Sequence, residues 1–275
     1  MLLIMSEDKT NKDNEMKNEI LDLVKATPNI LGQVYTDLAQ PGVRAVGNVL
    51  GTVLEFSTSF LLPIKLLNEK FKLNFTKRLD EYKDKLEQIP EEKRCEVHPQ
   101  VGTPIIEKLS YTTNEEIADL FTTLLANASN VDMVNTAHPS FVNMIERMSP
   151  DEARLLKYLK GKKDLQYCTF KGNVLEGTGF ITLIDYATLL ENETELSFPK
   201  NISAYLSNFV SLGILKDMHG QYKIDKTIYN KIREDYHLKE LEKEYVPKTF
   251  KSITVEESFF NVTDFGKLFI KACIG

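Results

Sequence analysis

The chain has 275 residues, 42% hydrophobic and 27% charged, which excludes wholesale disorder and fits one large folded domain or two of ordinary size. The formal net charge of −6 argues against a general phosphate-binding surface, because nonspecific nucleic-acid affinity comes mainly from Lys and Arg. Three widely spaced cysteines exclude a disulfide framework and predict reduced thiols in a cytoplasmic protein.

The first residues predict a flexible tail. Five apolar residues open the chain, too few for the core of a secretory signal peptide. The polar residues that follow show no period, so we expect residues 1–18 to be a flexible tail. Apolar spacing then predicts short helices over about 18–24 and 30–38, separated by Pro28.

Residues 43–62 form the most informative stretch, an apolar segment between two prolines. Its apolar side chains surround nearly the whole predicted helix, so this helix must be buried, either in a protein core or in a membrane. Gly47 and Gly51 lie on one helical face and permit close helix approach, as in membrane dimers. Arg44 and Glu55 oppose insertion, because a charge near the bilayer centre costs about 2.5 to 3.5 kcal/mol. We therefore favour a buried core helix, with conditional membrane insertion as the alternative.

A long amphipathic helix is predicted next, over about 65–88. Its apolar residues recur every three or four positions in one stripe, and Lys, Glu and Asp fill the other face. Pro99, Gly102 and Pro104 then predict a connecting segment before a short helix over 105–109.

Two helix starts close the amino-terminal half. Thr113 or Asn114 is expected to cap a helix that runs to about residue 125. After a short helix near residues 139–148, Ser149 supplies a cap, followed by a proline and carboxylates that favour a helix start. The pattern is helical throughout up to this point.

The sequence changes character after residue 160. Residues 166–187 favour short strands around glycines, because aromatic and β-branched residues gather there. Helical spacing returns from Asn201 and ends at Gly213. Residues 213–224 then predict a strand, a tight turn and a second strand.

A charged helix over about 226–244 is expected next, and the chain closes with a strand at 259–262 and a helix that Thr263 caps. This order resembles a winged helix domain, so we assign residues 149–275 to a winged-helix-like α+β domain. The predicted fold class is mainly α: an all-helical amino-terminal domain over 19–148, followed by the winged-helix-like domain.

Six short segments share their order and spacing with a known family. They are Val34-Tyr35-Thr36-Asp37 through Gln40-Pro41, Val46-Gly47 through Leu54-Glu55, Ile89-Pro90-Glu91-Glu92, Leu124-Leu125-Ala126-Asn127-Ala128, His138-Pro139-Ser140-Phe141, and Met148-Ser149-Pro150-Asp151-Glu152 with Leu155. Together with the closing segment 262–270, they resemble the Abi-alpha family of bacterial abortive-infection proteins. The resemblance implies a role in defence against phage, and it brings no catalytic residue with it.

The sequence carries no complete catalytic, cofactor-binding or metal-binding motif. Cys95 and His98 have half of a zinc spacing, but no second pair of ligands lies at a suitable distance. Gly161-Lys162-Lys163 lacks the upstream glycine and the following Ser or Thr of a phosphate loop. We therefore predict that the protein is not an enzyme and needs no cofactor.

Candidate functional residues come from the shared segments and the apolar stretch. They are Tyr35, Asp37, Gly47, Gly51, Glu55, His138 and Ser140. A hydrolase would need Ser140 on a strained elbow with a third orienting carboxylate, so the favoured role of His138 and Ser140 is to start a helix. Asp37 and Glu55 can meet Glu116 and Asp119 in a helical bundle, where an ion pair is favoured over catalysis.

These observations predict a non-enzymatic phage-defence protein whose carboxy-terminal domain senses a phage component or mediates assembly. The expected partner is a phage or host protein, or a second copy of the chain. Nucleic acid is not expected, because the predicted recognition helix, 201–212, has Lys200 at its start and little other positive charge. The alternatives are an effector that perturbs the membrane through residues 43–62 on activation, and a winged-helix regulator that binds DNA.

Overall fold

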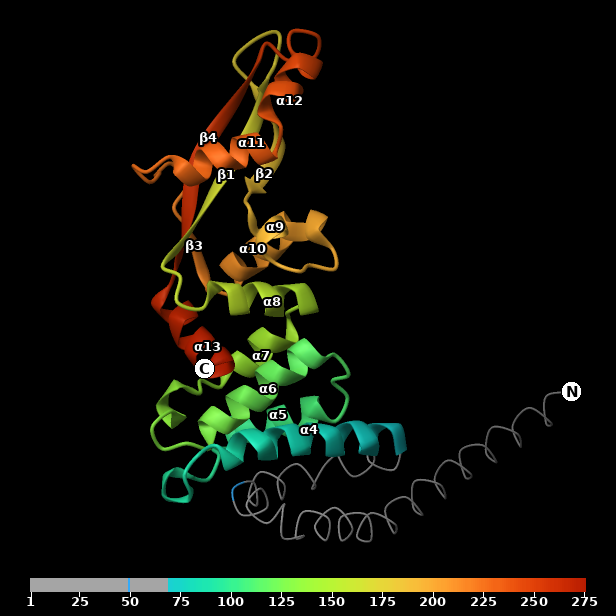
Figure 1. Cartoon of the computed structure of the whole chain (residues 1–275), viewed down its shortest axis with the longest axis vertical. Coiled ribbons are helices and arrows are strands. Elements are labelled where there is room, and N and C mark those ends of the chain that lie inside the picture. Colours follow the sequence, from blue (N-terminus) through green and yellow to red (C-terminus); the bar gives the residue numbers. More distant parts are fainter. Residues whose placement is uncertain (1–48, 50–68) are drawn as a thin grey trace, which may run out of the picture. The chain divides into compact units, whose positions relative to one another are not determined.

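The computed structural model describes residue 49 and residues 69–275 (Figure 1). This part of the chain is mainly α-helical, with ten α-helices and one antiparallel sheet of four strands. The mainly α fold class is confirmed, and the sheet lies in the carboxy-terminal part, as predicted. Predictions for residues 1–48 and 50–68, the 43–62 helix among them, lie outside the described residues.

The chain divides into two compact units, Met1–Val142 and Asn143–Gly275, which we call unit 1 and unit 2. The domain limits that the sequence suggests, with a division after residue 148, stay a prediction. The described part of unit 1 is helical, and its extended backbone pairs at one isolated bridge, between Arg94 and Asn130. The elements of unit 1 are α4 (Glu69–Glu87), η1 (Glu91–Lys93), α5 (Pro99–Leu109), α6 (Glu115–Ala128), η2 (Val134–Thr136) and the start of α7 (Ser140–Glu146).

The apolar stripe of α4 faces the core of unit 1. Its members Phe75, Leu79, Tyr82 and Leu86 are all buried, as their spacing predicts. Tyr82 also places its hydroxyl 2.6 Å from the hydroxyl of Ser129, at the end of α6. Because a buried hydroxyl needs a partner, this contact fixes how α4 lies against α6.

Two polar side chains of α4 hold the turn between α5 and α6. The amide of Asn74 lies 3.0 Å from the carbonyl oxygen of Leu109 and 3.1 Å from that of Thr112. Arg78, which is 1% exposed, donates to the carbonyl of Thr112 at 3.3 Å and pairs with Glu115 at 2.7 Å. The last carbonyls of a helix have no partner within the helix, so these contacts satisfy groups that would otherwise be buried unpaired.

The segment that was expected to connect two helices is itself helical, so that prediction was wrong. Helix α5 begins at Pro99, where the missing N–H costs nothing, and His98 Nδ1 accepts from Gln100 N at 3.2 Å. Pro104 lies inside the helix and removes one backbone donor. The helix nevertheless forms because its neighbours pack into the core, where Ile105 is fully buried.

The predicted caps are present. Asn114 Oδ1 accepts from the backbone N–H of Ile117 at 3.1 Å at the start of α6. Ser149 starts α8 (Pro150–Leu159) with a capping box, because Ser149 Oγ accepts from Glu152 N at 3.3 Å and Glu152 accepts from Ser149 N at 2.6 Å.

The sheet of unit 2 has the strand order β2-β1-β4-β3. Its strands are β1 (Asp164–Asn173), β2 (Phe180–Ala187), β3 (Leu215–Asp217) and β4 (Ser252–Val262). The central pair is β1 and β4, which are antiparallel along the whole of β1, from Asp164 opposite Asn261 to Asn173 opposite Ser252. The strands expected within 166–187 and at 259–262 are confirmed.

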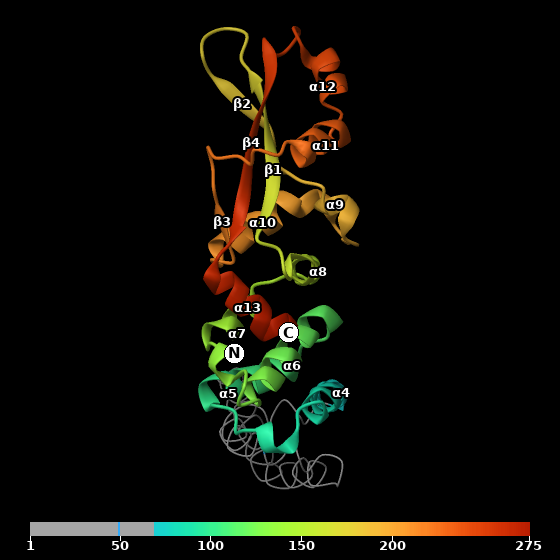
Figure 2. The same ribbon diagram turned by 60° about the vertical axis from the view of Figure 1, so that its left-hand side comes forward.

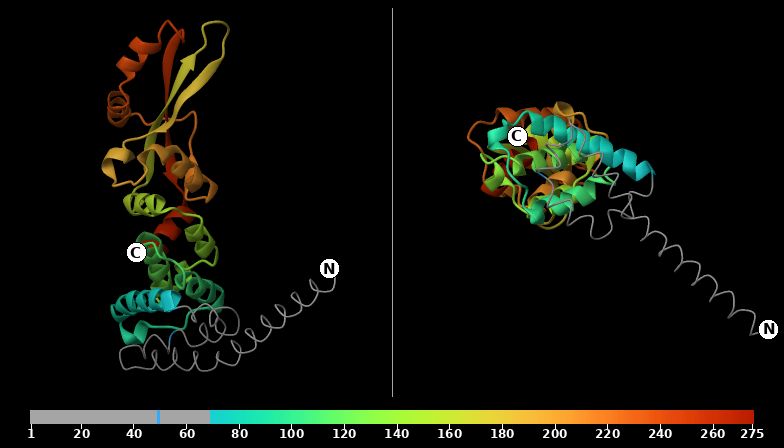
Figure 3. Two further views of the ribbon diagram at one scale, coloured as in Figure 1. Left: turned by 90° about the vertical axis from the view of Figure 1, so that its right-hand side faces the viewer. Right: turned by 90° about the horizontal axis from the view of Figure 1, so that it is seen from below.

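Six helical elements follow α8 in unit 2. They are α9 (Leu190–Glu193), η3 (Pro199–Asn201), α10 (Ile202–Ser211), α11 (Thr227–Asp235), α12 (Leu238–Tyr245) and α13 (Asp264–Ile274). Figure 2 and the left panel of Figure 3 show α11 and α12 on one face of the sheet, where Cys168 and Phe170 of β1 pack against Tyr229 and Ile232 of α11. Thr263 caps α13 by accepting from Gly266 N at 2.8 Å, as predicted.

Two predictions for the segment 213–244 were wrong. Only the first strand of the hairpin expected over 213–224 forms, and β3 pairs with the distant β4 rather than with residues 221–224. The single charged helix is two helices, because His237 has a left-handed backbone conformation with φ of +51° between α11 and α12.

Candidate functional site

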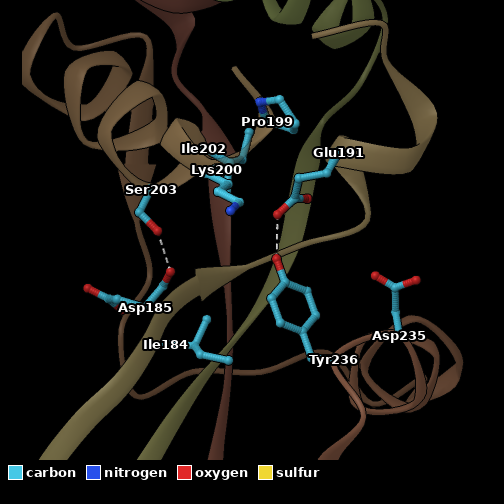
Figure 4. Close-up of a pocket in the computed structure, with 9 residues that line it drawn as sticks. All are labelled: Ile184, Asp185, Glu191, Pro199, Lys200, Ile202, Ser203, Asp235 and Tyr236. Carbon is cyan, nitrogen blue, oxygen red and sulfur yellow. Dashed lines mark hydrogen bonds between the residues drawn. The ribbon is translucent and has the colours of Figure 1, made fainter. Parts of the chain in front are cut away.

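Unit 2 contains an open pocket of about 390 Å³, formed by the end of β2, α9, the start of α10 and the end of α11 (Figure 4). Its lining consists of Ile184, Asp185, Glu191, Pro199, Lys200, Ile202, Ser203, Asp235 and Tyr236. The lining combines apolar side chains with converging polar and charged groups, as in binding pockets of proteins. We therefore take this pocket as the candidate site.

A β-bulge brings Asp185 to the pocket. Between two paired positions, β2 has two residues, Asp185 and Tyr186, where β1 has only Thr169. Tyr186 has a φ of +52°, in the left-handed region that bulky residues rarely adopt. Asp185 Oδ1 accepts from the Thr169 hydroxyl and from Tyr186 N, each at 3.0 Å, so the carboxylate stabilises the bulge that positions it.

Glu191 ties α9 to the end of α11. The hydroxyl of Tyr236 donates to Glu191 Oε1 (Figure 4). The hydroxyl of Thr188 donates to Glu191 Oε2 at 3.0 Å. Burial, together with the hydrogen bond to Glu191, raises the pKa of Tyr236 above its ordinary value. The phenol therefore stays protonated at neutral pH and acts as a hydrogen-bond donor rather than as a base.

The charges of the pocket are unbalanced. Asp235 Oδ1 accepts a hydrogen bond from the Asn192 amide at 2.8 Å, and Asp185 and Glu191 are bonded to hydroxyl or backbone groups. None of these three carboxylates forms an ion pair with any described residue, and Lys200 is the lining cation. The pocket thus presents excess negative charge beside apolar side chains.

A second polar cluster lies on β1. The hydroxyl of Tyr167 donates to Asp217 at 2.5 Å, and the hydroxyl of Tyr186 donates to the other oxygen of Asp217 at 3.3 Å. Burial, with the charge of Asp217, raises the pKa of Tyr186 to about 12. The rings of both tyrosines also contact Phe260. These contacts join all four strands, which indicates a structural role.

The candidates His138 and Ser140 are brought together at the start of α7. The backbone N–H of Ser140 donates to His138 Nδ1 at 3.1 Å, so this nitrogen carries no proton and the Ser140 hydroxyl, at 2.6 Å, also donates to it. Phe141 is buried. The geometry is that of a helix start. The other candidates, Tyr35, Asp37, Gly47, Gly51 and Glu55, lie outside the described residues.

The remaining candidates for site chemistry have structural contacts. Asp119 of α6 pairs with Lys85 of α4 at 2.6 Å, an ion pair between helices. His98 caps α5, and the thiol of Cys95 donates to the carbonyl of Ala128 at 3.7 Å. Within residues 69–275 no group of three or more His, Cys, Asp or Glu side chains is arranged to hold a metal ion.

A family profile matches residues 68–273, which is most of the chain. The family is described as abortive infection alpha. The chain belongs to this family. The resemblance inferred from short segments is confirmed, and membership indicates a role in abortive infection. No curated protein matches this abortive infection alpha chain.

A solved structure of an uncharacterized protein from the hydrocarbon-degrading marine bacterium Alcanivorax borkumensis SK2 shares 13% sequence identity with this chain, with a TM-score of 0.33. The match covers 54% of this chain and 99% of that one, and the low score supports no conclusion about fold or function.

Sequence reasoning missed the pocket of this abortive infection alpha protein. Seven of its nine residues lie within 184–203, in β2, α9, η3 and α10, but Asp235 and Tyr236 come from the end of α11, and no sequence spacing relates the two groups. The one local signal is the acidic Asp185 directly after the apolar strand residues 180–184. The bulge that positions Asp185 depends on pairing with β1, which the sequence of β2 does not specify.

Among the helices of the described part of the chain, none combines the length and apolar content needed to cross a membrane. Residues 43–62, which raised the question of insertion, lie outside this part.

Proposed function

We propose that this protein acts in phage defence through non-catalytic protein contacts made in the cytoplasm, with unit 2 as the sensing or assembly module. The match of residues 68–273 to the abortive infection alpha family carries the proposal. The hydrogen bonds of Glu191 to Tyr236 and of Asp185 to Thr169 hold the shape of the pocket, which fits a contact surface. Such hydrogen bonds fix the conformation of the pocket lining.

A winged-helix-like architecture for unit 2 is supported by its topology. Helices α9 and α10 are followed by antiparallel β3 and β4, and β1 completes a sheet in the order β1-β4-β3. In this interpretation α10 takes the place of the recognition helix. Helix α10 contains no Lys or Arg, whereas helices that read DNA are positioned by basic contacts to phosphates. The proposal therefore favours protein contacts.

The test is a phage challenge of cells that produce the full-length chain. The wild type is expected to reduce phage yield and the survival of infected cells. Ser140→Ala removes a group that hydrolytic chemistry would need, so it is expected to keep protection if its folding is unchanged. Absence of protection against a broad phage panel would contradict the defence role. Loss of protection in a well-folded Ser140→Ala protein would contradict the non-catalytic role.

Two measurements on the purified chain separate the alternatives. A membrane effector releases dye from anionic liposomes, and Gly51→Leu is expected to abolish the release if residues 43–62 cause it. A DNA-binding regulator shifts duplex DNA at low salt and releases it as salt rises. The proposal expects neither result.

A further inference from the structure

The pocket of unit 2 has the size of a ligand site, and its lining indicates the chemistry of the ligand. The volume of about 390 Å³ lies within the range of pockets that hold ligands in proteins. Ile184, Pro199 and Ile202 supply apolar lining, beside three carboxylates and one ammonium group, that of Lys200. Such a lining favours a ligand that is apolar along its length and positively charged at one end.

Two of the carboxylates are held on one side of the pocket. Neighbouring residues of α9 bond to neighbouring residues at the end of α11: the Tyr236 hydroxyl donates to Glu191, and the Asn192 amide donates to Asp235 Oδ1 at 2.8 Å. Figure 4 shows both carboxylates on the side of the pocket opposite Ser203. Neither forms an ion pair with a residue that the structure describes. A cation that binds on this side is therefore attracted by both.

An exposed aromatic side chain adjoins the pocket. Phe198 directly precedes the lining residue Pro199 and is 66% exposed. Its backbone is ordered, because its N–H donates to Asp151 at 2.8 Å and its carbonyl accepts from Asn201 N at 3.0 Å. An aromatic ring on ordered backbone loses little conformational entropy when it binds. Such a ring beside a pocket is typical of a protein contact surface, whereas a site for a small cation has no use for it.

The side chains of arginine and lysine match this surface. Each has an apolar stem, which fits against Ile184 and Ile202. Each ends in a cation, which fits beside Glu191 and Asp235. A metal ion would gain nothing from the apolar lining. A protein segment supplies both the basic side chain and a neighbouring apolar residue for Phe198.

We infer that the pocket binds a basic side chain, arginine or lysine, of a partner protein, and that Phe198 contacts an apolar residue next to it in the partner. The inference rests on the proposed function, since it names the chemistry by which unit 2 recognises its protein partner. Lys200 opposes the binding of a cation, so its removal strengthens the contact.

The test is a titration of the full-length chain, labelled at isoleucine methyl groups, with the peptide acetyl-Gly-Ser-Leu-Arg-Leu-Ser-Gly-amide. Binding is expected to shift the methyl NMR signals of Ile184 and Ile202 and to weaken as the salt concentration rises. The control is the same peptide with citrulline, which has the shape of arginine without its charge. It is expected to bind about tenfold more weakly, because the carboxylates lose a charged donor.

Four variants locate the contact. Asp235→Asn removes one pocket charge and is expected to weaken binding about tenfold. Glu234→Gln makes the same change at the preceding residue, which is exposed and outside the lining, and is expected to bind like the wild type. Phe198→Ser is expected to weaken binding and Lys200→Gln to strengthen it. Equal melting temperatures establish that all variants are folded.

Several outcomes overturn the inference. They are no binding of the arginine peptide, equal binding of the citrulline peptide, equal binding to Asp235→Asn and the wild type, and weaker binding to Lys200→Gln, which would indicate an anionic ligand. Phage challenge separates these failures from that of the proposed function. A chain that protects cells without binding the peptide overturns the inference alone. A chain that binds the peptide and gives no protection contradicts the proposed function and leaves the binding site in place.

Discussion

Asp151, in the first turn of α8, accepts a hydrogen bond at 3.0 Å from the hydroxyl of Tyr205 in α10, and both side chains are buried. The same carboxylate accepts from the backbone N–H groups of Ser197 and Phe198, each at 2.8 Å. One buried carboxylate thus joins the start of α8 to the loop before α10, and so positions a helix that lines the pocket.

Asp151→Asn is expected to destabilise the protein by about 1–3 kcal/mol, because buried N–H groups lose a charged acceptor. Burial alone raises the pKa of Asp151, but the N–H groups of Ser197 and Phe198 and the hydroxyl of Tyr205 outweigh it, so the pKa lies below the ordinary value. The stabilisation is therefore present above the ordinary pKa of an aspartate and is lost as the pH falls through the lowered value.

Urea unfolding at a series of acid pH values checks this expectation. The wild type should lose stability on acidification more steeply than Asp151→Asn. Glu176→Gln, in the exposed turn between β1 and β2, is the control and should keep the slope of the wild type. Parallel slopes for Asp151→Asn and the wild type would show that Asp151 does not contribute this linkage.

Arg78→Met is expected to destabilise unit 1 by about 2–3 kcal/mol, because the carbonyl of Thr112 and the carboxylate of Glu115 lose a charged donor. The hydrogen bond from Arg78 lowers the pKa of Glu115 from 4.5 to about 2. The pair therefore stabilises the fold above pH 4.5, and its contribution disappears as the pH falls toward 2. Lys77→Met changes an exposed partner of the same carboxylate and should cost much less, as measured by thermal and urea unfolding.

Gly266→Ala tests the contact between α13 and Ile214, which lies directly before β3. A Cβ atom at Gly266 would lie 2.3 Å from the carbonyl oxygen of Ile214, a backbone atom that cannot move aside alone. The substitution is expected to cost about 1–3 kcal/mol, since overpacking forces the backbone to shift. At Gly179 the same atom would lie 3.6 Å from the side chain of Val174, so Gly179→Ala should be nearly neutral in calorimetry. Equal melting temperatures would mean that α13 shifts freely.

His138→Ala separates a structural from a chemical role for the His138–Ser140 pair. Loss of the acceptor at the start of α7 is expected to cost about 1 kcal/mol, as for other helix caps. His138→Asn retains a side chain that can accept from Ser140 N, so it should recover most of this stability. In both variants, the level of phage protection should fall only as far as the stability of the protein falls. A protein with His138→Asn that is stable but inactive would point to chemistry at this pair.

The parts of the fold that were predicted correctly depend on local interactions. Asn114, Ser149 and Thr263 cap their helices through hydrogen bonds to backbone groups three residues away. The stripe of α4 is likewise a local pattern, because residues three or four apart share one helical face. Pro104 shows the limit of such signals, since packing around Ile105 keeps α5 helical through a proline.

The sequence by itself determined the helical class, the caps, the presence of strands after residue 160 and the family, because each of these is encoded in short segments. Only the tertiary structure decided that β3 pairs with β4, that β2 carries a bulge at Asp185, and that Glu191 meets Tyr236 across the pocket. These contacts join residues far apart in the chain. Their free energy comes from packing and desolvation in the folded unit, which no local pattern records.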